Sequence, residues 1–213
     1  LSAGRSVPVG LEPALDALRR HLAAKLGMVE QGEHAWAWVT EFPLFDWDAD
    51  LNRLVSAHHP FTMPHGDDLK RLREATGGDR PLTPGEARAL YTRGMRSLAY
   101  DAVYNGNELA SGSVRIHDPE LQGMIFRALG MTAEEARSKF GFLLEAFRYG
   151  APPHAGFAFG FDRLAMLLAG APSLRDVIAF PKTTAARGLM EGAPATASEV
   201  DLRDLHIRTE KPT

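Results

Sequence analysis

The sequence predicts an α+β fold, in which helices flank an antiparallel β-sheet. Two strand-like runs, residues 97–104 and 107–116, are joined by Asn105-Gly106, and this dipeptide is the strongest short signal for a hairpin between antiparallel strands. Leucines at helical spacing and capping-box sequences predict helices before and after the hairpin. Both kinds of element are therefore expected to contribute to the core.

The composition suits one or two globular domains. The 213 residues are 45% hydrophobic and 24% charged, which is enough to bury a sizeable core. The formal charge of -3 gives no overall basic footprint for nucleic acid, so any RNA contact must come from a local patch. The absence of cysteine excludes disulfides, thiolate nucleophiles and cysteine zinc sites. No segment resembles a signal peptide or a membrane span, so a cytoplasmic location and no membrane partner are expected.

The N-terminal segment predicts one amphipathic helix. Residues 1–10 are small and polar and begin at Leu1 rather than at methionine, so a cut end is expected here. Pro13 suits the first turn of the helix and Gly27 suits its C-terminal cap. The leucines at helical spacing are expected to face the core: Leu11, Leu15, Leu18, Leu22 and Leu26.

Residues 35–57 predict two strands and a connection. The aspartates in the connection, at positions 46, 48 and 50, superficially suggest a calcium loop. However, no glycine follows at the sixth loop position and no glutamate at the twelfth, so a solvated turn is favoured.

Two adjacent histidines follow this region. Pro60 favours extended geometry in the residue before it, so the side chains of His58 and His59 should point in opposite directions and only one can face a given site. By itself such a pair is more often one surface and one structural residue than a metal site.

Farther along, the sequence from Thr83 to Glu86 is a capping box for a helix ending near Arg93. The preceding basic residues are expected on a solvated face: Lys70, Arg71, Arg73 and Arg80.

The hairpin carries a candidate metal site. A two-residue turn places Tyr104 opposite Asn107 and Val103 opposite Glu108. Asp101 then lies on the same face as Glu108, as a diagonal neighbour with the Cβ atoms about 7 Å apart. Two carboxylates at that separation can bind one divalent cation, whose other ligands are water and phosphate oxygens.

Arg115 follows Glu108 by seven residues, an odd interval that puts it on the opposite face of a regular strand. If Arg115 serves the same pocket the strand must bulge, and Ser111-Gly112 is the expected place. The forked donors of arginine suit a carboxylate ligand. The alternative is a diagonal salt bridge on the sheet.

Asp118 and Pro119 predict the start of a helix that Gly130 ends, and Thr132 opens a second helix that reaches Gly150. The apolar side chains expected in the core here are Phe126, Phe140, Leu144 and Phe147.

A glycine-rich strand-to-helix turn follows. Residues 156–160 alternate phenylalanine with glycine or alanine, so one face of the strand carries almost no side chain. Gly160 is expected to permit a tight turn into a buried helix containing the apolar run 164–168. Arg163 should emerge in its first turn, where a planar guanidinium can stack on a ring and bind phosphate. The alternative is a β-to-α turn with a surface arginine. After Lys182 the tail is polar and has little periodicity.

The run Gly-Phe-Ala-Phe-Gly-Phe-Asp-Arg-Leu at 156–164 closely resembles the third signature motif of class II aminoacyl-tRNA synthetases. Five further blocks occur in order, and together they resemble the bacterial-type aspartyl-tRNA synthetases. These blocks are His-His-Pro-Phe-Thr at 58–62, Gly-Ser-Val-Arg-Ile-His-Asp-Pro at 112–119, Lys-Phe-Gly-Phe at 139–142, Tyr-Gly-Ala-Pro-Pro-His at 149–154 and Ile-Ala-Phe-Pro-Lys-Thr-Thr at 178–184.

This resemblance implies the class II catalytic-core fold, represented here in part, and a set of site residues. It implies that His58 and Arg115 bind the substrate amino acid, with Arg115 reading its side chain. It implies that Asp101 and Glu108 hold Mg2+ and that Glu108 and Arg163 are the catalytic residues. The implied ATP-binding residues are Glu108, Gly160, Phe161, Asp162 and Arg163. One departure is Ala110-Ser111, where the family tends to have glycines, so two added side chains could crowd the pocket floor.

The implied reaction is ATP-dependent activation of L-aspartate to aspartyl-adenylate and transfer to tRNA(Asp). The implied domains are the end of an inserted domain, residues 1–30, and the C-terminal part of the catalytic domain, residues 31–213. No Phe-Arg-x-Glu-like second motif is found, since Phe126-Arg127 and Phe147-Arg148 fall in predicted helices and lack the glutamate. The 213 residues alone are therefore expected not to form the adenylate. The full-length enzyme is expected to be a homodimer that binds tRNA.

Two other classes of protein fit the same motifs. One is a non-catalytic, synthetase-like nucleotide-binding or regulatory module. The other is an aspartyl-adenylate-forming enzyme that does not use tRNA, such as an asparagine-synthesising relative. The sequence leaves open whether tRNA(Asn) is also charged.

Overall fold

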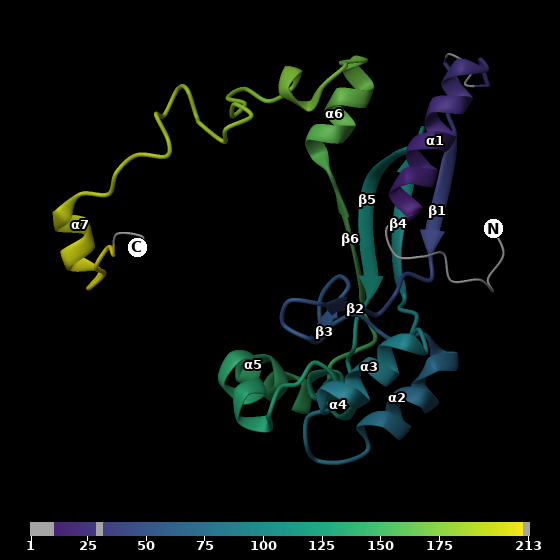
Figure 1. Ribbon diagram of the computed structural model, residues 1–213, viewed down its shortest axis with the longest axis vertical. Helices are drawn as coiled ribbons and strands as arrows, with labels where there is room; N and C mark the ends of the chain where they lie inside the picture. Colours follow the sequence, from purple (N-terminus) through teal and green to yellow (C-terminus); the bar gives the residue numbers. More distant parts are fainter. Residues whose placement is uncertain (1–10, 29–31, 211–213) are drawn as a thin grey trace. The chain divides into compact units, whose positions relative to one another are not determined.

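The computed structural model describes residues 11–28 and 32–210, and the chain divides into two compact units after Phe157. The larger sheet has the strand order β1-β4-β5-β6 (Figure 1). Residues 1–10, and the predicted domain boundary after residue 30, lie outside the described part of the chain.

The predicted hairpin is confirmed. β4 (Ala99–Tyr104) pairs antiparallel with β5 (Asn107–Val114) on one side and with β1 (Trp36–Thr40) on the other. The turn residues Asn105 and Gly106 have φ angles of 45° and 78°, and two positive angles define the tight type I′ turn. The predicted register is also present, since Tyr104 lies opposite Asn107 and Val103 opposite Glu108.

The prediction of one strand before the aspartate turn is wrong, because the chain forms two strands there. After β1, Glu41 has a φ of 60° and Pro43 has no backbone N–H, so the ladder cannot continue. The chain then pairs β2 (Phe45–Asp48) with β3 (Arg53–Ser56) in a separate two-stranded sheet. Asp48 accepts a hydrogen bond from the Leu51 N–H at 2.9 Å, which shapes the turn between them.

Three helices of the first unit begin where the sequence predicts. They are α3 (Pro84–Thr92), α4 (Pro119–Ala128) and α5 (Ala133–Arg148), and they follow α2 (Leu69–Thr76), for which the sequence predicted no bounds. Both capping boxes form: the Thr83 and Thr132 hydroxyls accept backbone N–H groups, and the glutamates three residues later accept in return. Asp118 caps α4 through the N–H groups of Glu120 and Leu121.

The core of the first unit lies where these helices meet the β2–β3 sheet and the segment after β5. Its buried members are Leu44, Phe45, Leu54, Leu72, Ala87, Leu90, Met95, Ile116, Leu121, Met124, Ile125 and Ala128. Phe126 is buried as predicted, and its ring stacks on Phe140 with 5.1 Å between centroids. Phe140, Leu144 and Phe147 are half-buried rather than fully in the core.

The N-terminal helix forms, but its predicted role in the core is wrong. α1 (Leu11–Lys25) ends in a left-handed cap at Gly27, with Met28 N–H donating to the Ala23 carbonyl at 2.9 Å. The described leucines of the stripe are 43–68% exposed: Leu15, Leu18, Leu22 and Leu26. Periodicity predicts the helix correctly, but burial also needs a facing surface.

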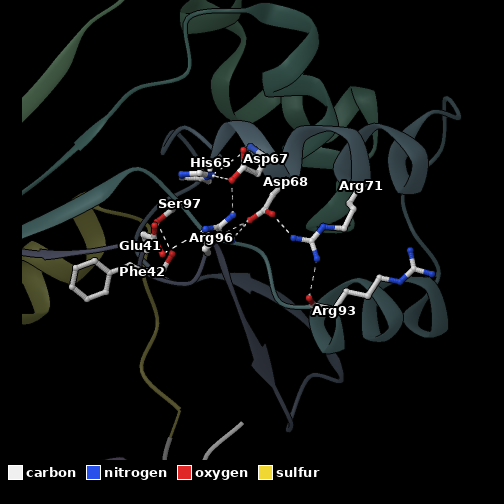
Figure 2. Close-up of polar contacts among 9 residues, drawn as sticks. All are labelled: Glu41, Phe42, His65, Asp67, Asp68, Arg71, Arg93, Arg96 and Ser97. Atoms are coloured by element: carbon white, nitrogen blue, oxygen red, sulfur yellow. Dashed lines mark hydrogen bonds and ion pairs between the residues drawn. The ribbon is translucent and has the colours of Figure 1, made fainter. Parts of the chain in front are cut away.

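A buried carboxylate ties the start of α2 to the segment that enters β4. Asp68, at the end of the single turn η1 (Gly66–Asp68), accepts the Arg96 backbone N–H at 2.8 Å and pairs with the Arg96 and Arg71 guanidinium groups (Figure 2). Arg71 also donates to the Arg93 carbonyl at 3.1 Å. Arg71 is thus not merely part of a solvated basic face, because it neutralises a carboxylate that is 1% exposed.

The second unit begins at Ala158, inside β6 (Ala155–Phe159), and has little core of its own. It contains α6 (Phe161–Ala169), the single turn η2 (Leu174–Asp176) and α7 (Glu199–Asp204). α7 lies in the tail, where the sequence showed little periodicity. No residue of these three helices is buried.

The expectation that residues 164–168 form a buried helix is therefore wrong with respect to burial. Within its unit α6 packs against η2, which is too short to cover an apolar face. In the parts of the chain that the structure describes, no helix combines the length and apolar character needed to cross a bilayer.

Candidate functional site

A bulge in β5 determines which side chains share the face of the hairpin. Ala102 lies opposite Ala110 and Val103 opposite Glu108, so Leu109 is an extra residue in β5. The predicted bulge is present, but its predicted position is wrong. Ser111 and Gly112 pair regularly, opposite Asp101 and Tyr100.

The bulge places acidic and basic groups on one face. Residues directly opposite in an antiparallel pair point to the same side, so Glu108 shares a face with Val103, and Ser111 with Asp101. Alternation beyond Ser111 puts Arg115 on that face too. The extra residue thus compensates the odd interval between Glu108 and Arg115.

Gly112 permits the backbone of Gly156, which belongs to the glycine-rich strand β6, to approach β5 closely. A Cβ atom at residue 112 would lie 2.0 Å from the Gly156 carbonyl oxygen and 2.6 Å from the Tyr100 ring. That carbonyl accepts the Tyr100 hydroxyl at 2.9 Å. The neighbouring Ala110, where the family tends to have glycine, is buried opposite Ala102 and leaves this contact intact.

Arg115 is held at the end of the hairpin by a backbone carbonyl and a histidine ring. Its backbone N–H donates to the His154 carbonyl at 2.9 Å, and its Nη1 lies 3.2 Å from Nδ1 of His59. A Cβ atom at Gly156 would lie 3.4 Å from its Nη2, so glycine leaves room for the guanidinium. No carboxylate of residues 11–28 or 32–210 forms an ion pair with Arg115. Its remaining donors suit a ligand carboxylate.

His59 is the residue that sequence reasoning missed. It is half-buried, and its ring nitrogens lie within 3.5 Å of Arg115, Ser113 and Thr62. By contrast, His58 is exposed and packs edge-on against Phe42, with 5.0 Å between ring centroids. The alternation at Pro60 predicted that only one histidine could face this surface. It could not identify which one contacts Arg115, because that depends on the bridge between Thr62 and Arg115, residues far apart in the sequence.

The carboxylates on this face fit a divalent ion as a pair. Oδ1 of Asp101 is buried and has no hydrogen-bond partner among the described residues, and a metal ion would satisfy it. The same part of the chain holds no cluster of three or more histidine and acidic side chains suited to a metal. Asp101 and Glu108 would thus supply two ligands, and water and phosphate oxygens the rest.

The remaining predicted residues belong to the second unit. Gly160 is the N-cap of α6, and its φ of -73° is open to any residue, so left-handed freedom is not what the turn needs. Phe161 and Asp162 are exposed. Arg163 lies in the first turn of α6, as predicted, and its side chain is half-buried. The strand-to-helix turn itself is confirmed.

An antiparallel hairpin flanked by helices, with a pair of carboxylates and an arginine on one face, is consistent with the class II synthetases. Residues 14–184 match the family described as tRNA synthetases class II (D, K and N), and the chain belongs to this family.

More specifically, the chain is similar to aspartate-tRNA ligases. It is 52% identical over 196 residues to the Aspartate--tRNA(Asp/Asn) ligase of Symbiobacterium thermophilum, covering 92% of this chain and 31% of that protein. It is also 52% identical over 177 residues to the Aspartate--tRNA ligase of Xylella fastidiosa, covering 83% of this chain and 27% of that protein. The chain thus spans less than a third of the length of these relatives. A solved structure, an aspartyl tRNA synthetase from Entamoeba histolytica, is similar at 24% identity with a TM-score of 0.49, over 87% of this chain and 29% of that one.

Proposed function

We propose that the protein containing this chain activates L-aspartate with ATP and transfers the aspartyl group to tRNA(Asp). One observation carries this proposal: Arg115 is half-buried and has no ion-pair partner among the described carboxylates. A cation so placed gains free energy from a ligand carboxylate, because the guanidinium is partly desolvated and its fork matches the carboxylate in two hydrogen bonds.

The residues divide by task in this proposal. Arg115 binds the side-chain carboxylate of aspartate and His58 contacts the same amino acid. ATP is bound by Gly160, Phe161, Asp162 and Arg163. Two residues, Arg163 and Glu108, contact the phosphate groups of ATP at which the reaction takes place. Catalysis of this kind depends on positioning and charge neutralisation more than on proton transfer.

Asp101 and Glu108 are the proposed ligands of Mg2+. Support comes from the buried, unpartnered Oδ1 of Asp101 and from the bulge that puts Glu108 on its face. When bound, Mg2+ neutralises the charge of the phosphate oxygens. A cation bound by both carboxylates would also reduce the repulsion between their charges.

The wider assignments follow from the same family. We propose that residues 1–30 end an inserted domain, that residues 31–213 are the C-terminal part of the catalytic domain, and that the whole protein is a cytoplasmic homodimer.

Relatives named for tRNA(Asp/Asn) and for tRNA(Asp) alone match this chain about equally well. The choice between those two tRNA specificities is therefore left open.

The test is aspartate-dependent ATP–pyrophosphate exchange by the whole gene product that carries these residues. Arg115→Lys should lower kcat/KM for aspartate about 100-fold, since the bidentate contact is lost, and Arg115→Ala should lower it further. Arg137→Lys, at an exposed arginine of α5, is the matched control and should leave the rate unchanged.

Other outcomes identify the competing functions. Binding of ATP without any amino-acid-dependent exchange would indicate a nucleotide-binding module. Exchange with aspartate but no transfer to tRNA would indicate an enzyme that uses the adenylate elsewhere. The 213-residue chain by itself is expected to show no exchange, and exchange at ordinary rates by that chain would contradict this expectation.

A further inference from the structure

His59 occupies the position that determines where the Arg115 guanidinium lies. Nδ1 of His59 is 3.2 Å from Arg115 Nη1 and also 3.2 Å from the backbone N–H of Phe61. Both neighbours can only donate hydrogen bonds, so Nδ1 must be the unprotonated, accepting nitrogen. The proton of the neutral ring is then on Nε2, which faces the Ser113 hydroxyl at 3.5 Å.

The surroundings of His59 disfavour its charged form. Burial, the Arg115 guanidinium and the neighbouring His58 all hold the pKa of His59 below its ordinary value. The other side chains within hydrogen-bond distance of the ring, those of Thr62 and Ser113, carry no charge. In the described chain, the charged or titratable groups that act on the ring are therefore Arg115, which lies within hydrogen-bond distance, and the adjacent His58, whose side chain packs on Phe42.

The ring is itself fixed in place by the surrounding backbone. The Phe61 N–H donates to it, and the carbonyl of the preceding Pro60 accepts the buried Gln122 side chain at 2.8 Å. Ile116 N–H in turn donates to the Phe61 carbonyl at 2.9 Å. The acceptor and Arg115 are thus attached to one hydrogen-bonded framework, which limits how far the guanidinium can swing.

We propose that neutral His59 is a positioning residue that aims the Arg115 guanidinium at the substrate carboxylate, and that protonation of His59 releases it. This inference rests on the proposed function and extends it to a residue that the carboxylate does not itself contact. An imidazolium has no acceptor and repels the guanidinium. Aspartate binding should therefore weaken as His59 becomes charged.

The experiment compares two replacements of His59 in the whole gene product, with ATP–pyrophosphate exchange measured against aspartate concentration and pH. His59→Asn keeps an acceptor oxygen the same number of bonds from Cα as Nδ1, but it cannot titrate. His59→Leu removes the acceptor. His21→Asn, at an exposed histidine of α1, is the matched control.

In the wild-type protein, KM for aspartate should rise as the pH falls below the ordinary titration range of histidine, because the lowered pKa of His59 shifts its protonation to more acidic pH. His59→Leu should raise KM about 10-fold at neutral pH with kcat nearly unchanged, and this KM should not rise further at low pH. His59→Asn should keep a KM near that of the wild type and also lose the pH dependence. A purely structural role would not produce rescue by asparagine together with loss of the pH dependence.

The results separate this inference from the function on which it rests. If Arg115→Lys impairs aspartate use but His59→Leu leaves KM and its pH profile unchanged, His59 does not position Arg115 and the proposed function stands. If the wild-type protein shows no aspartate-dependent exchange, both fail. Should His59→Leu not fold, a pH-dependent KM in His59→Asn like that of the wild type overturns the inference, and a flat profile supports it.

Discussion

Two apolar helices of this chain, α4 and α6, differ in what their apolar residues contact. α4 buries six residues: Leu121, Gln122, Met124, Ile125, Phe126 and Ala128. α6 is more apolar along its length and buries none. Both begin where the sequence predicts. The sequence pattern thus specifies a helix and its apolar face, whereas burial depends on a second surface that the pattern does not describe.

The surroundings of the two helices explain the difference. α4 packs against α2 and α5, and its start is capped by the Asp118 side chain. α6 has a glycine N-cap without a side-chain hydrogen bond, and within its unit it packs against the single turn η2. The first unit should therefore resist unfolding as one cooperative body, while α6 should contribute little to that resistance.

The largest expected effect is at the centre of the well-packed region. Phe126→Ala removes a ring that is 2% exposed and stacked on Phe140, so the free energy of unfolding should fall by about 3–4 kcal/mol. Urea unfolding of the purified 213-residue chain measures this. Phe142→Ala on α5, where the ring is 82% exposed, is the control and should change stability by less than about 0.5 kcal/mol. Equal effects at the two positions would contradict the described core.

The next effect concerns the buried carboxylate of Asp68. Asp68→Asn should lower the free energy of unfolding by about 2–3 kcal/mol at neutral pH, because both ion pairs are lost while the Arg96 N–H keeps an acceptor. Asp67→Asn is the control: Asp67 also pairs with Arg96, but it is exposed, so the expected change is below about 0.5 kcal/mol.

The same site predicts a pH dependence. Burial raises the pKa of Asp68, but the Arg96 N–H and the guanidinium groups of Arg71 and Arg96 outweigh it, so the pKa is lower in the folded state. The unfolded state then binds more protons, and this contribution to stability is complete above about pH 4 and is lost below it. Wild type and Asp68→Asn should therefore converge in stability at acid pH. A constant difference between them would exclude this explanation.

A smaller effect is expected at a helix cap. Thr83→Ala removes the hydroxyl that accepts the Glu86 N–H, which should cost about 1 kcal/mol in urea unfolding. Thr83→Ser keeps the hydroxyl and should recover most of that loss. If serine and alanine behaved alike, the hydroxyl would not contribute through capping.

The smallest effect is expected in α6. Leu168 is 80% exposed, so Leu168→Ala should change the free energy of unfolding by less than about 0.5 kcal/mol. Leu72→Ala, at a fully buried leucine of α2, is the comparison and should cost about 2–5 kcal/mol. A loss above about 2 kcal/mol at Leu168 would show that the apolar face of α6 is covered in solution.

Local signals predicted much of the fold. The Asn105-Gly106 turn, the register of the hairpin and both threonine caps depend on residues close together in sequence, and all are confirmed. Burial of α1 and α6 was predicted wrongly, because it depends on distant surfaces. The break between β1 and β2 carried a visible signal in Pro43, which the strand prediction did not weigh.

The candidate site was predictable to a similar extent. The odd interval between Glu108 and Arg115 correctly required a bulge, because side-chain alternation is strict. Its position at Leu109 could not be inferred, because glycine within a strand commonly marks a bulge and this led to a predicted bulge at Gly112. There the glycine serves the close approach of Gly156 instead. The contact between His59 and Arg115 joins segments 56 positions apart, which no local pattern encodes.

The extra residue in β5 has a consequence for comparing distant homologues. Deleting Leu109 would leave a regular ladder in which Glu108 still lies opposite Val103, on the face of Asp101, and in which Arg115 follows at an even interval on the same face. A homologue of the same length whose strand continued without the bulge would instead keep every letter and turn its arginine to the reverse side of the sheet from the glutamate. The spacing between the two residues, considered together with the bulge, is therefore a better guide to a complete site than the presence of the letters alone.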